Sequence, residues 1–238
     1  MRLLLFFIIL FTLSCEDKKT ESNSLAKPTE ETDVKIDTIA EDKVTKEKDT
    51  IEQEFPLLTE KNAMDFFLEY ERENAENKVR ITTDFGEIDI LLYPKTKFHR
   101  ANFIYLTKRN YFDNTQFYRV INNFMIQGGN TDDPKVKRKR RFIGKYLLPK
   151  DTKRGYRHDR GTISMPSSDI DNPHKLASPY EFFIIQNPRG EYRLDTDYTI
   201  FGKVIRGMNV VDKIAAVETD KADWPLKNVY IQKVEIIE

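Results

Sequence analysis

The first periodic pattern of apolar residues along the chain has the spacing of a helix. It consists of Ala63, Phe66, Phe67 and Tyr70, which fall on one face of a helical segment. Thr59, just before this face, is a suitable N-cap residue. The pattern therefore predicts an N-terminal helix within residues 55–77, ahead of the main domain.

A period of two follows, which is typical of strands. Apolar and polar residues alternate from Val79 to Phe85 and again from Ile88 to Leu92. Gly86 lies between the two stretches and permits a tight turn. This segment is predicted to form a β-hairpin.

Further short strands follow with few helices between them. The predicted strands are Gln116–Ile121, Phe124–Gln127, Thr162–Met165, Glu181–Ile185, Tyr198–Ile205 and Val229–Ile237. The predicted helices are Asn102–Lys108 and a segment marked by Met208, Val211 and Ile214. This balance favours a closed or nearly closed antiparallel barrel over an alternating α/β fold.

The composition is that of a folded domain without redox or metal chemistry. Of the 238 residues, 12% are aromatic, and the mean hydropathy of −0.61 excludes a bundle of membrane spans. The 39 Lys and Arg balance the 39 Asp and Glu, so the net charge indicates no polyanionic partner. A single cysteine excludes an internal disulfide framework, and the three histidines lie far apart in the sequence, so we expect no metal or cofactor.

The first residues have the layout of a secretory signal peptide. Arg2 precedes an apolar run, Leu3 to Phe11, that is too short to cross a bilayer as a helix. The small residue Ser14 comes directly before Cys15. We therefore expect residues 1–14 to be a cleaved signal peptide.

The ending Thr12-Leu13-Ser14-Cys15 resembles the lipobox of bacterial lipoproteins. The resemblance implies that Cys15 is lipidated and becomes the first residue of the mature chain. It also implies a location in the bacterial cell envelope, anchored to a membrane and facing outside the cytoplasm. Lipoboxes usually have Leu where this chain has Thr12, so an ordinary cleaved signal peptide is the alternative, and a buried thiol is a third interpretation.

Residues 16–54 have the composition of a disordered segment. They contain no aromatic residue and hold 13 acidic and 7 basic residues, a net charge of −6. Such a segment cannot bury enough apolar surface to offset its chain entropy. We expect residues 15–54 to be an acidic tether that begins with the lipidated cysteine and leads to the folded domain at 78–238.

A run of basic residues lies in the folded part. Six of the seven residues from Lys135 to Arg141 are Lys or Arg. The run could be a nucleic-acid or anionic-lipid patch. Because no aromatic residues are interleaved with the charges, we predict a solvated surface loop with no specific nucleic-acid role.

The candidate chemistry lies between Phe117 and Asn130. If the first part of this stretch is a strand, Arg119 projects to the outer face, and its neighbours Tyr118 and Val120 pack inward. A guanidinium on the outside of a barrel keeps its charge at all relevant pH values and is available to a ligand.

The second part of the stretch adds an amide and apolar groups to the same surface. Met125 and Gln127 share a face by alternation, and Gly128-Gly129 gives a turn or bulge that lets backbone approach a ligand. With no nucleophile, metal ligand or histidine base here, the surface suits binding of a neutral, partly apolar peptide. The alternative is that Phe124 and Met125 are ordinary core residues.

The same stretch resembles the signature of cyclophilins, the barrel-shaped peptidyl-prolyl isomerases, which is close to F-H-R-V-I-x-x-F-M-I-Q-G-G-D. The resemblance extends from Val79 to Glu238. The supporting segments are Asp84–Ile88, Asn102-Phe103, Arg160–Met165, Glu181–Ile184, Phe201–Val204 and Gly207-Met208. It implies a mainly β fold, a closed antiparallel eight-stranded barrel with two capping helices, to which the N-terminal helix is added.

The resemblance also implies a role for individual residues. Arg119 would be the catalytic arginine, and Gln127 its hydrogen-bonding neighbour. The walls of the proline pocket would be Phe124, Met125, Phe183 and Leu194. Tyr198 stands where many members have His and others Tyr.

Three residues depart from the family pattern. Pro166 replaces a small residue that lines the substrate groove, Glu181 replaces the usual Gln, and Arg193 stands where an aromatic residue is common. These departures affect the expected peptide preference more than the expected catalysis.

The sequence thus predicts a monomeric peptidyl-prolyl cis-trans isomerase that assists the folding of exported proteins. Its partners would be proline-containing polypeptides and, through the lipid anchor only, a membrane. No cofactor and no nucleic acid are expected. The alternative is a proline-peptide binding chaperone module with weak or no turnover, and a weaker third interpretation is a nucleic-acid binder that uses Lys135 to Arg141.

Overall fold

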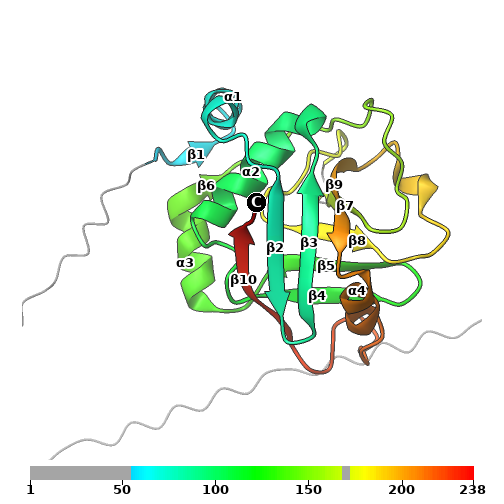
Figure 1. Cartoon of the computed structure of the whole chain (residues 1–238). Helices are drawn as coiled ribbons and strands as arrows, with labels where there is room; N and C mark the ends of the chain where they lie inside the picture. The colour runs from blue at the N-terminus through cyan, green and yellow to red at the C-terminus, as the bar shows by residue number, and fades with distance from the viewer. Residues whose placement is uncertain (1–54, 168–171) are drawn as a thin grey trace, which may run out of the picture. The chain divides into compact units, whose positions relative to one another are not determined.

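A computed structural model describes residues 55–167 and 172–238 of the chain (Figure 1). The predicted signal peptide, Cys15 and the predicted tether lie outside the described residues. No helix within the described residues is long and apolar enough to span a membrane.

Eight strands form a closed antiparallel barrel (Figure 1). They are β2 (Lys78–Thr83), β3 (Gly86–Leu92), β4 (Thr115–Ile121), β5 (Met125–Asn130), β7 (Thr162–Met165), β8 (Phe182–Ile185), β9 (Thr199–Arg206) and β10 (Val229–Ile236). Their order around the barrel is β10-β2-β3-β9-β7-β8-β5-β4, and β4 pairs with β10 to close it. The predicted mainly β barrel is confirmed.

The first hairpin shows how the alternating pattern builds the barrel interior. Val79 pairs with Ile90 and Ile81 pairs with Ile88, and all four side chains are fully buried. Gly86 has a φ of +125°, a conformation that favours glycine, and it allows the tight turn between β2 and β3. The hairpin prediction is therefore confirmed in both its strands and its turn.

Two helices cap the barrel. They are α2 (Lys97–Lys108), which lies against β10, and α4 (Met208–Ala215), which lies against β3. Helix α2 begins earlier than the predicted segment and follows a short 3₁₀ helix, η1 (Pro94–Thr96). A second 3₁₀ helix, η2 (Tyr192–Leu194), precedes β9.

Helix α1 (Ala63–Glu73) packs on the barrel domain through the predicted face. Ala63, Phe67 and Tyr70 are buried, and Tyr70 meets Tyr105 of α2 edge to face at 5.3 Å between ring centroids. The residues of this face belong to the same hydrophobic core as the barrel interior. The N-terminal helix therefore shares one core with the barrel.

The predicted N-cap of this helix was wrong. Thr59 lies in the short strand β1 (Leu58–Thr59), and the N-cap position is taken by Asn62. The reason is a long-range pairing: Thr59 faces Lys145 in a parallel ladder between β1 and β6 (Gly144–Lys145). Asn62 in turn accepts a hydrogen bond from the Thr59 backbone N–H at 2.7 Å.

The basic run is also not the loop that its composition predicts. It forms helix α3 (Pro134–Ile143), which directly precedes β6. Pro134 occupies the first turn, and the Asp133 side chain accepts a hydrogen bond from the Lys135 backbone N–H at 2.8 Å. Val136 and Ile143 are buried and fix the helix to the core. Two apolar anchors and a good N-cap outweigh the repulsion among the exposed charges.

Candidate active site

The eight site residues implied by the sequence surround one cavity of about 260 Å³. These residues are Arg119, Phe124, Met125, Gln127, Pro166, Phe183, Leu194 and Tyr198, and Ser167 completes the lining. They come from β4, β5, β8, the end of β7 and the segment from η2 to β9. Residues far apart in the sequence thus meet on one wall of the barrel.

The cavity lies on the outer wall because of the strand alternation. Ile126 and Ile184, opposite each other on β5 and β8, are fully buried in the main core. Their neighbours Met125 and Phe183 face the other way and form a second hydrophobic cluster with Ile185. Met125 is therefore buried without belonging to the main core.

Aromatic and apolar side chains complete the walls of the second cluster. Phe124, Leu194 and Tyr198 are partly buried and pack against it. The Tyr198 ring meets the Phe183 ring edge to face at 5.6 Å between centroids. The Arg193 guanidinium lies 4.9 Å from the centroid of the Phe124 ring, so it forms part of the rim.

Arg119 and Gln127 are directly opposed across β4 and β5. The register of the two strands shifts between Phe117 and Arg119, which is a β-bulge centred on Tyr118. Val120 is buried in the main core as predicted, but Tyr118 is not. The bulge turns Tyr118 toward the same wall as Gln127, and the prediction that it packs inward was wrong.

A hydrogen-bond relay fixes the orientation of the Gln127 amide. Gln127 Nε2 donates to the Tyr118 hydroxyl, which donates to Glu181 Oε2 at 3.1 Å. The other Glu181 oxygen accepts from Asn130 Nδ2 at 3.2 Å. Burial, and then the Glu181 carboxylate, raise the pKa of Tyr118, so its hydroxyl stays protonated and remains a donor. With its nitrogen engaged, Gln127 has its carbonyl oxygen left for a substrate.

Arg119 is held by a loop that sequence analysis did not connect to the site. Its Nε lies 3.4 Å from Oδ2 of Asp223, in the segment between α4 and β10. The same loop is fixed to β4, because the Val120 N–H donates to the Asp223 carbonyl at 2.8 Å, and the Trp224 ring packs 5.8 Å from the Tyr118 ring. Asp223 has a φ of +64°, uncommon for a non-glycine residue. No motif marks Asp223, although Trp224 is the chain's only tryptophan.

A buried histidine packs against Phe183, one of the residues that line the cavity. The His158 ring lies nearly parallel to the Phe183 ring, with centroids 6.0 Å apart. Its Nδ1 is 2.7 Å from Asp195 Oδ1, and its Nε2 is 3.0 Å from Ser164 Oγ. Burial lowers the pKa of His158, which favours the neutral ring. Because His158 and Ser164 are fully buried, this serine, histidine and aspartate set meets no substrate and acts as a support for Phe183 and η2.

The site therefore offers a permanent cation, an oriented amide and an apolar pocket. Among residues 55–167 and 172–238, no group of three or more His, Cys, Asp or Glu side chains is placed to hold a metal ion. The arrangement can grip an apolar ring and donate hydrogen bonds to a group beside it. Its one serine, Ser167, accepts a hydrogen bond from Asn172 Nδ2 at 3.0 Å, and no histidine lines the cavity to act as its base, so covalent catalysis is poorly served.

A family model described as cyclophilin type peptidyl-prolyl cis-trans isomerase/CLD matches residues 78–236. The chain belongs to this family. The match covers the whole barrel and every residue that lines the cavity.

Individual relatives agree with the family match. A peptidyl-prolyl cis-trans isomerase of Acinetobacter baylyi is 36% identical over 165 residues, covering 68% of this chain and 84% of the relative. Peptidyl-prolyl cis-trans isomerase B of Escherichia coli is 31% identical over 172 residues, covering 67% of this chain and 99% of the relative. A cyclophilin-type isomerase of Cryptosporidium parvum, solved in the presence of the dipeptide Ala-Pro, matches with a TM-score of 0.54 and 28% identity over 68% of this chain and 99% of that one.

Proposed function

We propose that this cyclophilin-type isomerase rotates X-Pro bonds in exported polypeptides and thereby assists their folding, with Arg119 as its catalytic residue. One observation carries the assignment of the site. The Arg119 guanidinium borders the same cavity of about 260 Å³ as six apolar or aromatic side chains and the Gln127 amide. A cation beside a ring-sized apolar pocket is the arrangement that prolyl bond rotation requires.

Rotation of an X-Pro bond is catalysed by a hydrogen-bond donor and requires no covalent intermediate. An X-Pro bond resists rotation with a barrier of roughly 18–20 kcal/mol because rotation breaks amide resonance. In the twisted transition state the prolyl nitrogen regains its lone pair. A guanidinium donor placed at that nitrogen stabilises the transition state more than the planar ground state, and this difference lowers the barrier.

The pocket walls hold the proline ring while the acyl side turns. Met125 and Phe183 are only 3% and 5% exposed, so they form a rigid floor in the second cluster. The Gln127 carbonyl oxygen accepts a hydrogen bond from the substrate backbone, in the orientation that Tyr118 sets. The solved relative crystallised with Ala-Pro supports a proline peptide as the ligand class.

We further propose that the mature chain is a monomer anchored in a bacterial envelope membrane through lipidated Cys15. The support is the apolar run that ends at Ser14, followed at once by the chain's only cysteine. Mass spectrometry of the mature N-terminus tests the anchor. An unmodified Cys15, or cleavage elsewhere, would contradict it.

An isomerisation assay on a short X-Pro peptide tests the catalytic assignment. Arg119→Ala should lower turnover by about 10² to 10³, the usual loss for one preorganised donor. Its thermal unfolding should stay close to wild type, because the Arg119 side chain is 43% exposed. If Arg119→Ala keeps wild-type activity, Arg119 is not the catalytic residue.

The binding-module alternative has its own observation. The Arg193 guanidinium lies over the Phe124 ring, and Asp223 pairs with Arg119. Both contacts restrict the movement of side chains that a substrate must contact. If wild type binds proline peptides but leaves their cis-trans exchange rate unchanged, the chaperone interpretation replaces the enzyme.

A further inference from the structure

A second cavity lies beside α3, away from the isomerase site. It has a volume of about 670 Å³ and is bounded by α3, by the paired strands β1 and β6, and by residues 178–180. Four cationic side chains line it: Lys137, Arg140, Arg141 and Lys145. Glu60 is the one carboxylate in the lining, so the cavity presents a net positive charge.

These cations are largely without internal partners. In the described part of the chain, Arg140, Arg141 and Lys145 form no salt bridge, and Lys137 pairs only with the exposed Asp132 at 3.2 Å. Arg140 is instead held with its guanidinium 4.5 Å from the centroid of the Tyr180 ring. Uncompensated like charges on one helix repel one another, so an external anion would stabilise this surface.

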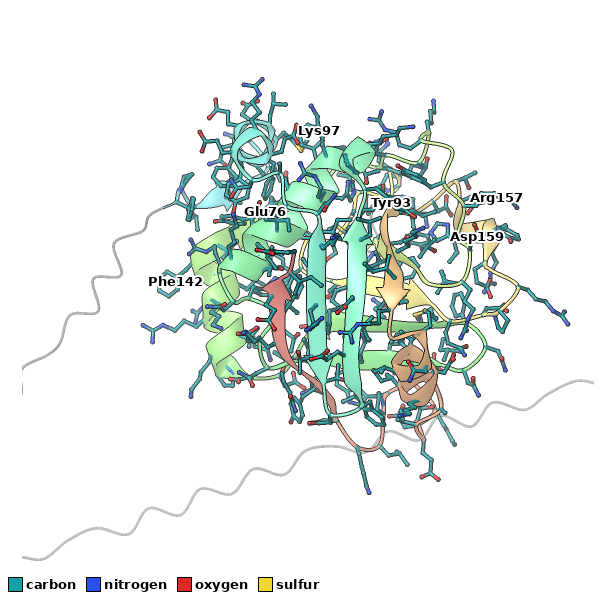
Figure 2. All side chains as sticks on the ribbon, in the orientation of Figure 1. Glu76, Tyr93, Lys97, Phe142, Arg157 and Asp159 are labelled. Carbon is teal, nitrogen blue, oxygen red and sulfur yellow. The ribbon has the colours of Figure 1, made fainter. Side chains whose placement is uncertain are left out.

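Two large apolar side chains are exposed on this part of the surface, and the ring of one of them, Phe142, has its centroid 5.7 Å from the guanidinium of Arg138 on α3. Leu57, which lines the cavity, is 50% exposed, and Phe142 on α3 is 48% exposed. Figure 2 shows Phe142 pointing outward from the left side of the molecule. Exposed Leu or Phe next to Lys and Arg is the composition of surfaces that enter the interface of an anionic bilayer.

The location of this surface leaves the isomerase site open. Figure 2 places Asp159 on the right side, opposite Phe142 on the left. The Tyr192 hydroxyl of η2 donates to Asp159 at 3.0 Å, and Leu194 of η2 lines the proline cavity. A flat partner that covers α3 therefore does not cover the proline pocket.

We propose that the surface formed by α3, Lys145 and Leu57 lies on a bilayer of anionic phospholipid. Six of the ten residues of α3 are Lys or Arg, which matches the negative surface potential of such a bilayer. A bilayer explains the exposed Phe142 and Leu57 as well as the charges, whereas a nucleic acid or an acidic peptide explains the charges alone. The described chain also begins at Phe55, two residues before Leu57, so the surface adjoins the point where upstream residues enter. The proposal is independent of the isomerase role.

The test uses the full chain with Cys15→Ser, so that no acyl chain contributes. Binding is measured by co-sedimentation with vesicles of phosphatidylcholine alone and with 30% phosphatidylglycerol. The test variant is Lys137→Gln/Arg141→Gln/Lys145→Gln. The matched control, Lys203→Gln/Lys213→Gln/Lys227→Gln, removes the same charge from exposed positions outside the cavity. All three proteins carry the same residues upstream of Phe55, which therefore contribute equally.

Wild type and the control should bind the anionic vesicles and not the neutral ones. The test variant should bind on the order of 100-fold more weakly, since each Lys or Arg near an anionic surface contributes about fivefold. Phe142→Ala should bind the anionic vesicles several-fold more weakly, although it keeps every charge. Isomerase activity should be the same in all variants, which separates this result from the function of the proline pocket.

Three results would overturn the proposal. One is equal binding to neutral and anionic vesicles, and another is equal loss in the test variant and the control. The third is binding to a DNA or RNA duplex, at physiological salt, that is tighter than binding to the vesicles, because the surface would then be a nucleic-acid site.

Discussion

The Arg119 Nε lies 3.4 Å from Asp223 Oδ2, which joins the proposed catalytic guanidinium to a loop 104 residues further along the chain. The pairing uses one edge of the guanidinium and leaves its terminal nitrogens for a substrate. Among the residues that line the pocket, Asp223 forms an ion pair with Arg119 alone. Its effect on turnover would therefore come through the orientation of the Arg119 side chain.

Asp223→Asn should therefore lower kcat on the order of tenfold, less than the loss of Arg119 itself. KM should change little, because the pocket walls stay in place. Steady-state kinetics on an X-Pro peptide measure both constants. Asp132→Asn, which removes an exposed carboxylate at α3, is the control and should match wild type. An unchanged kcat in Asp223→Asn would mean that the ion pair does not position Arg119.

Tyr118→Phe should separate the role of the hydroxyl from that of the ring. The variant keeps the packing on Trp224 but frees the Gln127 amide and removes a donor from Glu181. We expect a rise in KM of about fivefold and a loss of stability of about 1 kcal/mol, the usual value for one hydrogen bond. Kinetics and urea unfolding measure the two effects. Tyr230→Phe, on β10, loses only a hydrogen bond from Asn228 Nδ2 between exposed groups, so it should leave KM unchanged and lower stability much less.

Acid should destabilise the domain through a buried histidine. Burial lowers the pKa of His99 from 6.5 to about 3, and neither ring nitrogen has a hydrogen-bond partner. Below pH 6.5 the unfolded chain binds a proton at this residue and the folded chain does not. Stability therefore falls with pH by about 1.4 kcal/mol per unit from this group, until the pH nears the folded-state pKa.

His99→Leu should remove that slope, so the loss of stability between pH 7 and pH 5 should be about 2 kcal/mol smaller than in wild type. Urea unfolding at several pH values measures it. His174→Gln, at an exposed histidine, should keep the wild-type slope. The same slope in His99→Leu and wild type would contradict the assignment.

The Asp89 carboxylate adds to acid sensitivity at lower pH. Hydrogen bonds from Arg80 reduce its pKa from 3.8 to about 2, so its contribution to stability is lost as the pH falls through that range.

Gly144→Ala should detach the N-terminal strand. A Cβ at this position would lie 1.9 Å from the Leu58 carbonyl oxygen, so β1 must move away from β6. Gly155→Ala is the matched control: Gly155 also has a positive φ, but a Cβ there meets nothing within 4 Å. Backbone strain of about 1 to 3 kcal/mol accompanies each substitution, and the clash with Leu58 should give Gly144→Ala the larger drop in Tm. Equal values of Tm would mean that β1 adds no stability.

The parts of the fold that depend on local pattern could be predicted from the sequence. The alternation of apolar and polar residues around Ile81 and Ile88 predicts the hairpin, and the spacing of Phe67 and Tyr70 predicts α1. Each pattern shows which side chains of its own segment are buried. Alternation also put Arg119, Met125 and Gln127 on one surface. The more distant lining residues Pro166, Phe183, Leu194 and Tyr198 were available only through resemblance to a family, since no period connects Arg119 with Leu194.

The remaining features depend on distant partners or on small energy differences. The bulge at Tyr118 follows from the register with β5, which alternation within one strand does not contain. Helix α3 needs only Val136 and Ile143 as anchors, too few for a periodic signal among so many charges. Asp223 meets Arg119 because β4 and β10 are neighbours in the closed barrel.

The separation of the pocket cluster from the main core bears on how this protein can diverge. Met125, Phe183 and Ile185 pack among themselves and with side chains of the rim, while the barrel is stabilised by a different set of residues on the other face of the same strands. Substitutions at an exposed rim position such as Arg193 can then alter which peptides are accepted without first passing through an unstable intermediate. A lineage, or a directed-evolution experiment, could exchange client preference in single steps on an unchanged scaffold.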